Sequence, residues 1–373
     1  MIVNGKGKRT AVSMAVAAGL AFAGLAQAQA QQPAKVNWRM QSAFGSQLTH
    51  LGPSGQRFVK DIEEMTDGNF VIKFHEPGAL VPSLECFDAA SKGSVDACWT
   101  TPGFHAGKYA VLPFFTTVPF GPSYGEFFAW KMFGNGNKLR QEIYDKHGLI
   151  AVDAFAIGPE TSGWFRKEIR SLDQLKGLKM RFFGLGAKVM QKLGVSTQLL
   201  APADIFPALE RGVIDAAEFS MPTMDIKQGF HQVAKFNYFP GWHQWVSVGE
   251  LLMNRKTFDA LPKSYKRFIE VAAANQVHYT YAETEAMQFD AMAEMRTKYK
   301  VELRRWKDNE IAAFEKAWVE VIQEESAKDP LFKKIADDYL AFRRNYAIWG
   351  DAQVMKPTYL SKPAALGKTA APK

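Results

Sequence analysis

The sequence has little cysteine, because only Cys86 and Cys98 occur among its 373 residues. Two cysteines cannot build a disulfide scaffold or a four-cysteine zinc site, and a chain of this length can bury a core without either. Two interpretations of the pair stay open. The cysteines form one disulfide in an oxidising compartment, or they are two small buried apolar side chains.

The sequence also lacks the common catalytic motifs. It contains no Gly-x-Ser-x-Gly elbow, no His-Glu-x-x-His pair and no phosphate-binding P-loop, and its seven histidines are scattered. Gly184-Leu185-Gly186 follows a strand-like run, but Val189 stands where a dinucleotide-binding loop has its third glycine. We therefore predict a protein that is not an enzyme, with a secreted α/β enzyme as an alternative.

Long basic blocks are absent, although the net charge is +8. Three of the basic residues, Lys6, Lys8 and Arg9, precede the first apolar run. Their removal would lower the net charge from +8 to +5. A nucleic-acid-binding protein normally gathers its basic residues on one face. The charge pattern therefore predicts no nucleic-acid partner.

Only the N-terminus carries a long apolar run. Residues 11–26 are apolar and follow the basic residues, and small residues flank Gln27 and Gln29 in the Ala-Gln-Ala sequences that end at Ala28 and Ala30. This order is typical of a secretory signal peptide. The run is shorter than the roughly 20 residues that a membrane-spanning helix needs. We predict a signal peptide at residues 1–30 that is cleaved near Ala28 or Ala30.

The rest of the chain alternates strand-like and helix-like segments. Residues 36–44, 69–74, 148–155 and 178–183 are rich in apolar and β-branched side chains, and amphipathic segments separate them. This alternation predicts an α/β fold with largely buried sheets. At roughly 100–200 residues per domain, the length indicates two domains.

Residues 87–97 and 206–216 form an internal repeat. Each copy begins with Phe, reads as a helix that ends at a glycine, and continues into a short apolar strand beginning Asp-Ala. Glycine at that place supplies the left-handed backbone that closes a helix. The two copies are too far apart for a solenoid and predict two similar lobes.

The C-terminal third is helical in character. No glycine or proline occurs between Pro262 and Pro330, so residues 264–299 are predicted to form one long helix, followed by a strand at residues 301–306 and another helix. Further on, an aromatic seam repeats at steps of three and four residues: Phe332, Ile335, Tyr339, Phe342, Tyr346 and Trp349. The seam packs on its own lobe or is exchanged with a partner subunit, and both interpretations stay open.

Four polar residues stand out in aromatic or glycine-rich surroundings. Arg181 ends an apolar run before the glycine turn, where its guanidinium can face a carboxylate. Glu160, Glu218 and Gln244 offer the carboxylate and amide oxygens that a hard cation prefers. Singly, each could instead be a solvated surface residue. Together they predict a cleft that holds an anionic ligand and a cation.

These segments resemble a known family, the substrate-binding subunits of TRAP (tripartite ATP-independent periplasmic) transporters. The resemblance rests on the segments at residues 179–181, 188–194, 208–216 and 240–243. Residues 114–121 and 329–335 are similar to the branch of the family that binds α-keto acids and related monocarboxylates. The match runs over nearly the whole chain after the signal peptide, in order and in spacing.

The resemblance implies a two-lobed periplasmic-binding-protein fold with a long helix crossing both lobes and a C-terminal helical arm. It implies that residues 31–155 and 246–285 form lobe 1, residues 156–245 and 286–328 form lobe 2, and residues 329–373 form a dimerisation helix and tail. It further implies a periplasmic protein that delivers a small carboxylate, a 2-oxo or 2-hydroxy monocarboxylic acid, to membrane permease subunits. A ligand sensor that feeds a receptor would share this fold and stays an alternative.

The resemblance also implies roles for single residues. Arg181 would bind the ligand carboxylate, and Glu160, Glu218, the Phe219 carbonyl and Gln244 would hold Na⁺ or Ca²⁺ against the ligand. Further ligand contacts are expected from Thr101, Phe104, Trp164, Trp242 and Asn254, besides Glu160. The branch typically has Gln, Trp and Glu at positions 160, 219 and 244, so two side-chain carboxylates are kept here in exchanged places. A homodimer through the C-terminal helix is implied as well.

Overall fold

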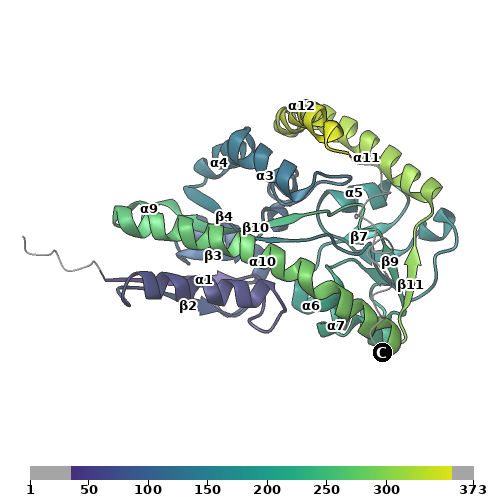
Figure 1. Cartoon of the computed structure of the whole chain (residues 1–373), viewed down its shortest axis with the longest axis horizontal. Coiled ribbons are helices and arrows are strands. Elements are labelled where there is room, and N and C mark those ends of the chain that lie inside the picture. Colours follow the sequence, from purple (N-terminus) through teal and green to yellow (C-terminus); the bar gives the residue numbers. More distant parts are fainter. Residues whose placement is uncertain (1–34, 355–373) are drawn as a thin grey trace, which may run out of the picture. The chain divides into compact units, whose positions relative to one another are not determined.

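The computed structural model describes residues 35–354 (Figure 1). The predicted signal peptide and the residues beyond 354 lie outside this range. Among the described residues, no helix is both long enough and apolar enough to cross a membrane. The folded part contains two sheets and many helices, as the α/β prediction requires.

The first sheet, sheet A, has the strand order β2-β1-β3-β10-β4. Its strands are β1 (Val36–Ser42), β2 (Phe70–His75), β3 (Ala97–Thr100), β4 (Leu149–Ile157) and β10 (Ser247–Asn254). Strand β1 pairs in parallel with β2 and β3, whereas β10 runs antiparallel to β3 and β4. We call the lobe built on this sheet lobe 1. Its helices are α1 (Leu51–Met65), α2 (Cys86–Ser91), α3 (Tyr124–Phe133), α4 (Gly136–Asp145) and α9 (Arg255–Asp259).

The second sheet, sheet B, repeats this order with one extra strand, as β7-β6-β8-β5-β9-β11. Its strands are β5 (Gly163–Phe165), β6 (Lys179–Arg181), β7 (Ser196–Gln198), β8 (Ala216–Ala217), β9 (Phe236–Phe239) and β11 (Glu302–Arg305). Strand β6 is parallel to β7 and β8, and β5 is antiparallel to β8 and β9, so the directions match those of sheet A. Lobe 2 contains this sheet with helices α5 (Gly184–Lys192), α6 (Pro202–Glu210), α7 (Pro222–Lys227) and α8 (Phe230–Val233).

The sequence repeat forms equivalent parts of the two lobes, which confirms its interpretation. Helices α2 and α6 are followed by Gly93 and Gly212 with φ of 73° and 71°, and then by β3 and β8. The Asp96 carboxylate accepts a hydrogen bond from the backbone N–H of Arg39 at 2.7 Å. In lobe 2, the Asp215 carboxylate accepts the matching bond from Lys179 at 3.0 Å. Each aspartate therefore ties the start of its strand to the parallel neighbouring strand, β1 in sheet A and β6 in sheet B.

One long helix belongs to both lobes, as the sequence predicts. Helix α10 (Lys263–Thr297) packs along β4 and α1 in lobe 1 and against α7 in lobe 2 (Figure 1). Its uninterrupted length follows from the absence of glycine and proline, because both residues weaken helix interiors. Strand β11 then joins the edge of sheet B and leads into α11 (Asp308–Lys328).

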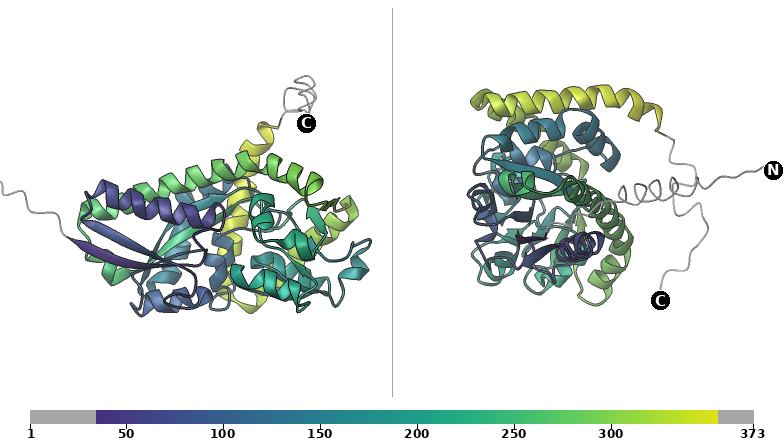
Figure 2. Two further views of the ribbon diagram at one scale, coloured as in Figure 1. Left: turned by 90° about the horizontal axis from the view of Figure 1, so that it is seen from below. Right: turned by 90° about the vertical axis from the view of Figure 1, so that its left-hand side faces the viewer.

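The C-terminal helix, α12 (Pro330–Ala352), packs on its own chain from its start to about Arg343, which donates to the Glu126 carboxylate at 3.0 Å. Phe332 and Tyr339 are buried against Phe114, with ring centroids 5.3 and 5.6 Å away. The last turns project from the neighbouring elements (Figure 2), and Trp349 at the end of the seam is 61% exposed. The inner half of the seam, up to Tyr339, therefore packs on its own lobe. The outer half ends in the exposed Trp349, so exchange with a partner subunit stays open for that half.

A buried charge network stiffens lobe 1. Arg140 on α4 lies 2.6 Å from the Asp153 carboxylate on β4 and 3.2 Å from that of Glu250 on β10. The Tyr144 hydroxyl donates to Glu250 at 2.6 Å, and Lys131 on α3 donates to the Phe115 carbonyl at 2.9 Å. Because every member has a charged or hydrogen-bonding partner, the network ties two helices to the neighbouring strands β4 and β10.

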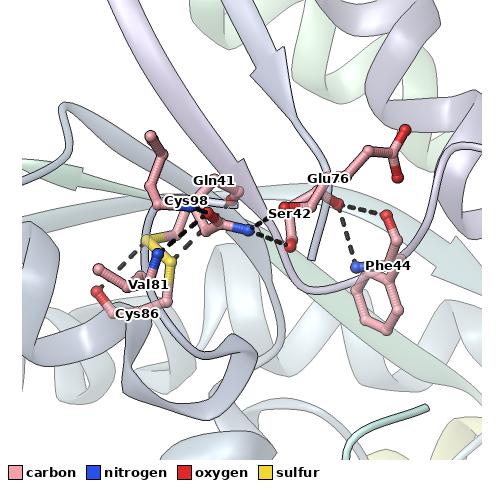
Figure 3. Close-up of a disulfide and its surroundings, with 8 residues drawn as sticks. Gln41, Ser42, Phe44, Glu76, Val81, Cys86 and Cys98 are labelled. Atoms are coloured by element: carbon pink, nitrogen blue, oxygen red, sulfur yellow. Dashed lines mark hydrogen bonds between the residues drawn. A yellow bond between two sulfur atoms is a disulfide. The ribbon is translucent and has the colours of Figure 1, made fainter. Parts of the chain in front are cut away.

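Cys86 and Cys98 form a disulfide, which decides between the two interpretations of the pair (Figure 3). Beside it, the Gln41 amide of β1 donates to the Glu76 carbonyl at 2.7 Å and accepts from the Leu80 N–H at 2.9 Å. Next along the chain, the Ser42 hydroxyl donates to the Phe44 carbonyl at 2.7 Å (Figure 3). These bonds fix the end of β1 and the direction in which Phe44 leaves it.

Candidate ligand-binding site

A small cavity lies between the two lobes. It measures about 50 Å³ to the centres of water-sized spheres, and one water needs roughly 10–15 Å³ on this measure. The space therefore suits a molecule of a few heavy atoms. The lining residues from lobe 1 are Phe44, Leu51, Thr101, Phe104, Thr116, Phe155, Ile157, Ser247 and Val248. Those from lobe 2 are Glu160, Arg181, Phe183, Phe219, Ser220 and Gln244.

The cavity sits where parallel strands of both sheets end. Thr101 follows β3, Phe183 follows β6 and Phe219 follows β8, each within two residues of the strand end. In open α/β sheets, ligands bind outside the carboxyl ends of the strands, where loops diverge. Since the two lobes share one strand order, both sheets direct the same type of loop at the cavity.

Arg181 is the only cationic side chain in the cavity wall and is 1% exposed. Its Nη1 donates to the Glu218 carboxylate at 2.9 Å and also to the Glu218 carbonyl. Its Nε donates to the Leu200 carbonyl at 3.4 Å. These bonds hold the guanidinium in place and leave Nη2 for a ligand. The guanidinium also lies 5.5 Å from the centre of the Phe219 ring, a cation–π distance.

Acidic and amide oxygens gather beside Arg181. Donor atoms of Glu160, Glu218 and His243 lie within 4.8 Å of one another, and all three side chains are buried. Glu160 Oε2, Glu218 Oε1 and Gln244 Oε1 have no hydrogen-bond partner among the residues that the structure describes. Buried oxygens without partners are costly, so this set fits a bound cation. His243 Nε2 approaches Glu218 Oε1 to 3.2 Å.

The charges of these groups interact strongly. Burial, and then the Glu218 carboxylate, raise the pKa of Glu160 well above its usual value. Burial would also raise the pKa of Glu218, but Arg181 and His243 outweigh it and hold that pKa below its usual value. Burial raises the pKa of Asp225 to about 8. Only one of the two glutamates is therefore readily charged before a cation arrives.

The remaining walls are apolar, and aromatic rings dominate them. The Phe155 ring stands on Gly249, where an added Cβ would lie 1.8 Å from the ring. The Phe104 ring of lobe 1 meets the Phe183 ring of lobe 2 edge-on at 5.5 Å, and a Cβ on Gly103 would lie 2.1 Å from Phe183. Two glycines thus allow the rings to close over the cavity.

The structure gathers most of the expected site residues but not all of them. Arg181, Glu160, Thr101, Phe104, Phe219 and Gln244 line the cavity, and Glu218 adjoins it through Arg181. Trp164 lies outside the lining, with its indole N–H donating to Asp225 at 2.7 Å. Trp242 is packed against Phe120 and Phe314 instead of facing the cavity.

Asn254 also lies away from the cavity. It ends β10, and its side-chain oxygen caps α9 by accepting the Thr257 N–H at 3.1 Å. An asparagine at a helix N-cap satisfies backbone donors there, so the sequence offers a local reason for its presence. We do not retain Trp164, Trp242 or Asn254 as ligand contacts.

The sequence analysis missed several residues of the site. His243 was set aside with the scattered histidines, although it directly precedes Gln244. Phe44 and Phe155 end the strand-like runs at residues 36–44 and 148–155, which is the one signal in the sequence that could have indicated them. Asp225 has no such signal, because only the fold brings it behind Trp164.

The chain is similar to known solute-binding proteins over most of its length. A family model for bacterial extracellular solute-binding protein, family 7 (DctP), matches residues 42–329. A monocarboxylate 2-oxoacid-binding periplasmic protein of Nostoc sp. is 34% identical over 315 residues, which cover 84% of this chain and 86% of the relative.

Two solved structures extend the comparison. A TRAP transporter solute-binding protein from Bordetella bronchiseptica, a mixed-occupancy dimer with copurified calcium and picolinate, aligns with a TM-score of 0.83 at 33% identity over 86% of this chain and 95% of that chain. A TRAP periplasmic solute-binding protein from Pseudoalteromonas atlantica, with bound sodium and pyruvate, aligns with a TM-score of 0.82 at 29% identity. The alignment covers 86% of this chain and 97% of that chain.

Two lobes of matching strand order around one small cavity are the architecture of a solute-binding protein. The chain belongs to the DctP family, and it is a substrate-binding protein of the TRAP type. Proteins of this type are periplasmic, bind small solutes and work with membrane permease subunits. The resemblance and the two-lobed fold expected from the sequence are thereby confirmed.

Proposed function

We propose that the protein captures a 2-oxo or 2-hydroxy monocarboxylic acid together with a cation. The observation that carries this proposal is Arg181, a buried cation in the cavity wall, beside three buried oxygens that have no hydrogen-bond partner among the residues that the structure describes. The guanidinium would bind the ligand carboxylate. The second ligand oxygen, a keto or hydroxyl group, would complete the coordination of the cation.

The cation ligands would be Glu160, Glu218, Gln244 and the Phe219 carbonyl. The set offers only oxygen donors, which suits Na⁺ or Ca²⁺. The relatives with picolinate and with pyruvate hold calcium and sodium respectively, which supports this assignment. The bound ion would supply positive charge against the carboxylates and against the ligand, and no organic cofactor is needed.

The size and lining of the cavity support a small acid. About 50 Å³ leaves room for a few heavy atoms, and Arg181 is the one cationic side chain among the described residues of the lining, so a second carboxylate on a longer ligand would have no charged partner. No nucleophile or acid–base pair is needed for capture, so we propose binding without catalysis. If the protein converts a tightly bound ligand into a product during prolonged incubation, this part of the proposal is wrong.

The test is calorimetry with pyruvate and other short 2-oxo and 2-hydroxy acids. Protein dialysed against chelator in sodium-free buffer is expected to bind them weakly, and restored Ca²⁺ or Na⁺ is expected to recover the affinity. Acetate is the matched control, because it keeps the carboxylate and lacks the second oxygen. Equal affinity for acetate and pyruvate, or undiminished binding without cation, would refute the bridging ion.

We also propose the lobe limits and a dimer. Residues 31–155 and 246–285 would move as lobe 1 and residues 156–245 and 286–328 as lobe 2. Residues 329–373 would form the dimerisation arm, and the exposed outer half of its aromatic seam supports this. Ile348→Ser with Trp349→Ser spares the inner half of α12, so the variant is expected to sediment as a folded monomer. A dimer that persists in this variant would refute the arm.

The export of the chain is the last part of the proposal. The mature protein would begin after Ala28 or Ala30 in the periplasm. N-terminal sequencing of protein from osmotic-shock fluid is expected to start at Gln29 or Gln31, and recovery of an intact Met1 there would contradict cleavage.

A further inference from the structure

His50 holds a rare backbone conformation just before α1. Its φ is 67° and its ψ is −60°, and the Leu51 N–H donates to the Thr49 carbonyl at 2.8 Å. These values and this bond define a classic γ-turn, which is strained for residues other than glycine. Such strain persists only where the surrounding structure imposes it, and it is common at functional sites.

The imidazole of His50 is buried and connects three elements. Its Nδ1 lies 2.9 Å from the Glu283 carboxylate of α10. Its Nε2 lies 2.9 Å from the Thr223 hydroxyl at the start of α7. His50 belongs to lobe 1 and Thr223 to lobe 2, so the contact with Thr223, which we call the His50–Thr223 bridge, crosses between the lobes.

The neighbours of the bridge supply matching hydrogen-bond partners. The Glu283 carboxylate can only accept, so His50 Nδ1 donates to it. The Gln288 amide nitrogen donates to the Thr223 hydroxyl oxygen at 3.0 Å, and the Gln288 amide oxygen lies 3.4 Å from the same hydroxyl. Between His50 Nε2 and the Thr223 hydroxyl, 2.9 Å apart, one atom can donate and the other accept. Both side chains of the bridge therefore have partners of the right kind.

Both ends of the bridge adjoin the cavity wall. Leu51, the residue after His50, lines the cavity from lobe 1. Phe219 and Ser220, which shortly precede Thr223, line it from lobe 2. A bond between the two ends fixes the separation of these walls without touching the enclosed ligand.

We propose that His50 is a positioning residue that holds the lobes in the closed, ligand-trapping arrangement through Thr223. The inference rests on the proposed carboxylate capture and adds a determinant of affinity outside the cavity. A ligand that binds the closed form loses apparent affinity in proportion to the share of protein that is open. Loss of one hydrogen bond is expected to weaken binding by about three- to tenfold.

The variants His50→Gly and Thr223→Val test the bridge. Glycine accepts the γ-turn, so it removes the imidazole without adding strain, and valine replaces the hydroxyl with a methyl group of similar size. Each single variant is expected to bind pyruvate about three- to tenfold more weakly, with faster dissociation. The double variant is expected to bind pyruvate as tightly as the single variant with the lower affinity, because the two substitutions remove the same contact.

His147→Ala is the matched control. Its ring bonds to the Tyr109 hydroxyl at 2.9 Å, and both residues lie in lobe 1. This variant is expected to keep wild-type affinity. Unchanged affinity in His50→Gly, or losses that multiply in the double variant, would overturn the proposal.

A second measurement separates this proposal from the proposed function. If wild-type protein binds no short 2-oxo acid, the proposed function fails, and small-angle scattering of the ligand-free proteins then tests the bridge. His50→Gly and Thr223→Val are expected to show a larger radius of gyration than wild type and His147→Ala. Equal radii for all four proteins in that experiment would overturn the role of His50.

Discussion

Replacement of Arg181 tests the centre of the site. The guanidinium is 1% exposed and is bonded to Glu218, which is fully buried. Removing one member of a buried ion pair typically costs about 3–5 kcal/mol, since it leaves the other charge unpaired. At 1.4 kcal/mol for each tenfold change, a ligand carboxylate that loses this partner should bind at least about a hundredfold more weakly. We therefore expect Arg181→Ala to raise the Kd for pyruvate by that factor or more.

Stability and binding must be separated in this experiment. Arg181→Ala should also lower the Tm, because Glu218 stays buried without its cation. Adding Glu218→Gln removes the unpaired charge, so the double variant is expected to recover much of the stability and none of the affinity. Arg211→Ala is the control, since Arg211 is an exposed arginine of the same lobe that bonds the Pro207 carbonyl. Calorimetry that finds folded Arg181→Ala within about threefold of wild type would refute the reasoning.

Three further predictions concern the pH response, the disulfide and the cavity wall. Burial raises the pKa of Glu250 from 4.5 to about 7. The native state therefore holds a proton that the unfolded chain releases, and the free energy of unfolding should fall between about pH 4.5 and 7, by at most about 1.4 kcal/mol per unit from this group. Urea titrations at pH 5 and 7 should show a smaller fall in Glu250→Gln, and parallel pH profiles would contradict this. The disulfide closes a separation of 12 residues, so Cys86→Ala with Cys98→Ala should cost about 3 kcal/mol of unfolding free energy, and equal urea midpoints would exclude that contribution. Phe155→Ala should enlarge the cavity and favour 2-oxopentanoate over pyruvate by about tenfold in the ratio of their Kd values, since each buried methylene contributes about 0.8 kcal/mol. An unchanged ratio in competition calorimetry would show that Phe155 does not limit ligand length.

Much of the fold could be predicted from local sequence. The long helix predicted at residues 264–299 occurs as Lys263–Thr297, because composition without glycine or proline determines it. The repeat predicted two matched lobes, and the aspartates of both copies make the same bond. These features depend on residues close together in the chain, so periodicity and capping signals suffice to find them.

The site could be predicted only where a residue type is unusual in its surroundings. Arg181, Glu160 and Gln244 are polar residues among aromatic and glycine-rich segments, and the structure brings all three to one cavity. Trp164 and Trp242 stand in equally aromatic segments but are used in packing. Sequence alone cannot distinguish these uses, because the direction of a side chain depends on which strand pairs beside it.

The bridge could not have been found from sequence at all. His50, Thr223 and Glu283 are far apart in the chain, and only the folded arrangement brings them together. Nothing in the neighbourhood of His50 indicates a γ-turn, since the turn is imposed by contacts on both sides.

The matched strand orders of the two sheets have a consequence for how such a protein diversifies. Lobe 2 supplies all the charged groups of the cavity wall, whereas lobe 1 supplies mainly apolar rings and hydroxyls. If the proposed function holds, lobe 2 recognises the carboxylate of the ligand, and lobe 1 fits the rest of the ligand molecule. Substitutions in lobe 1 would then change which acid is taken up and leave the residues that hold its carboxylate intact.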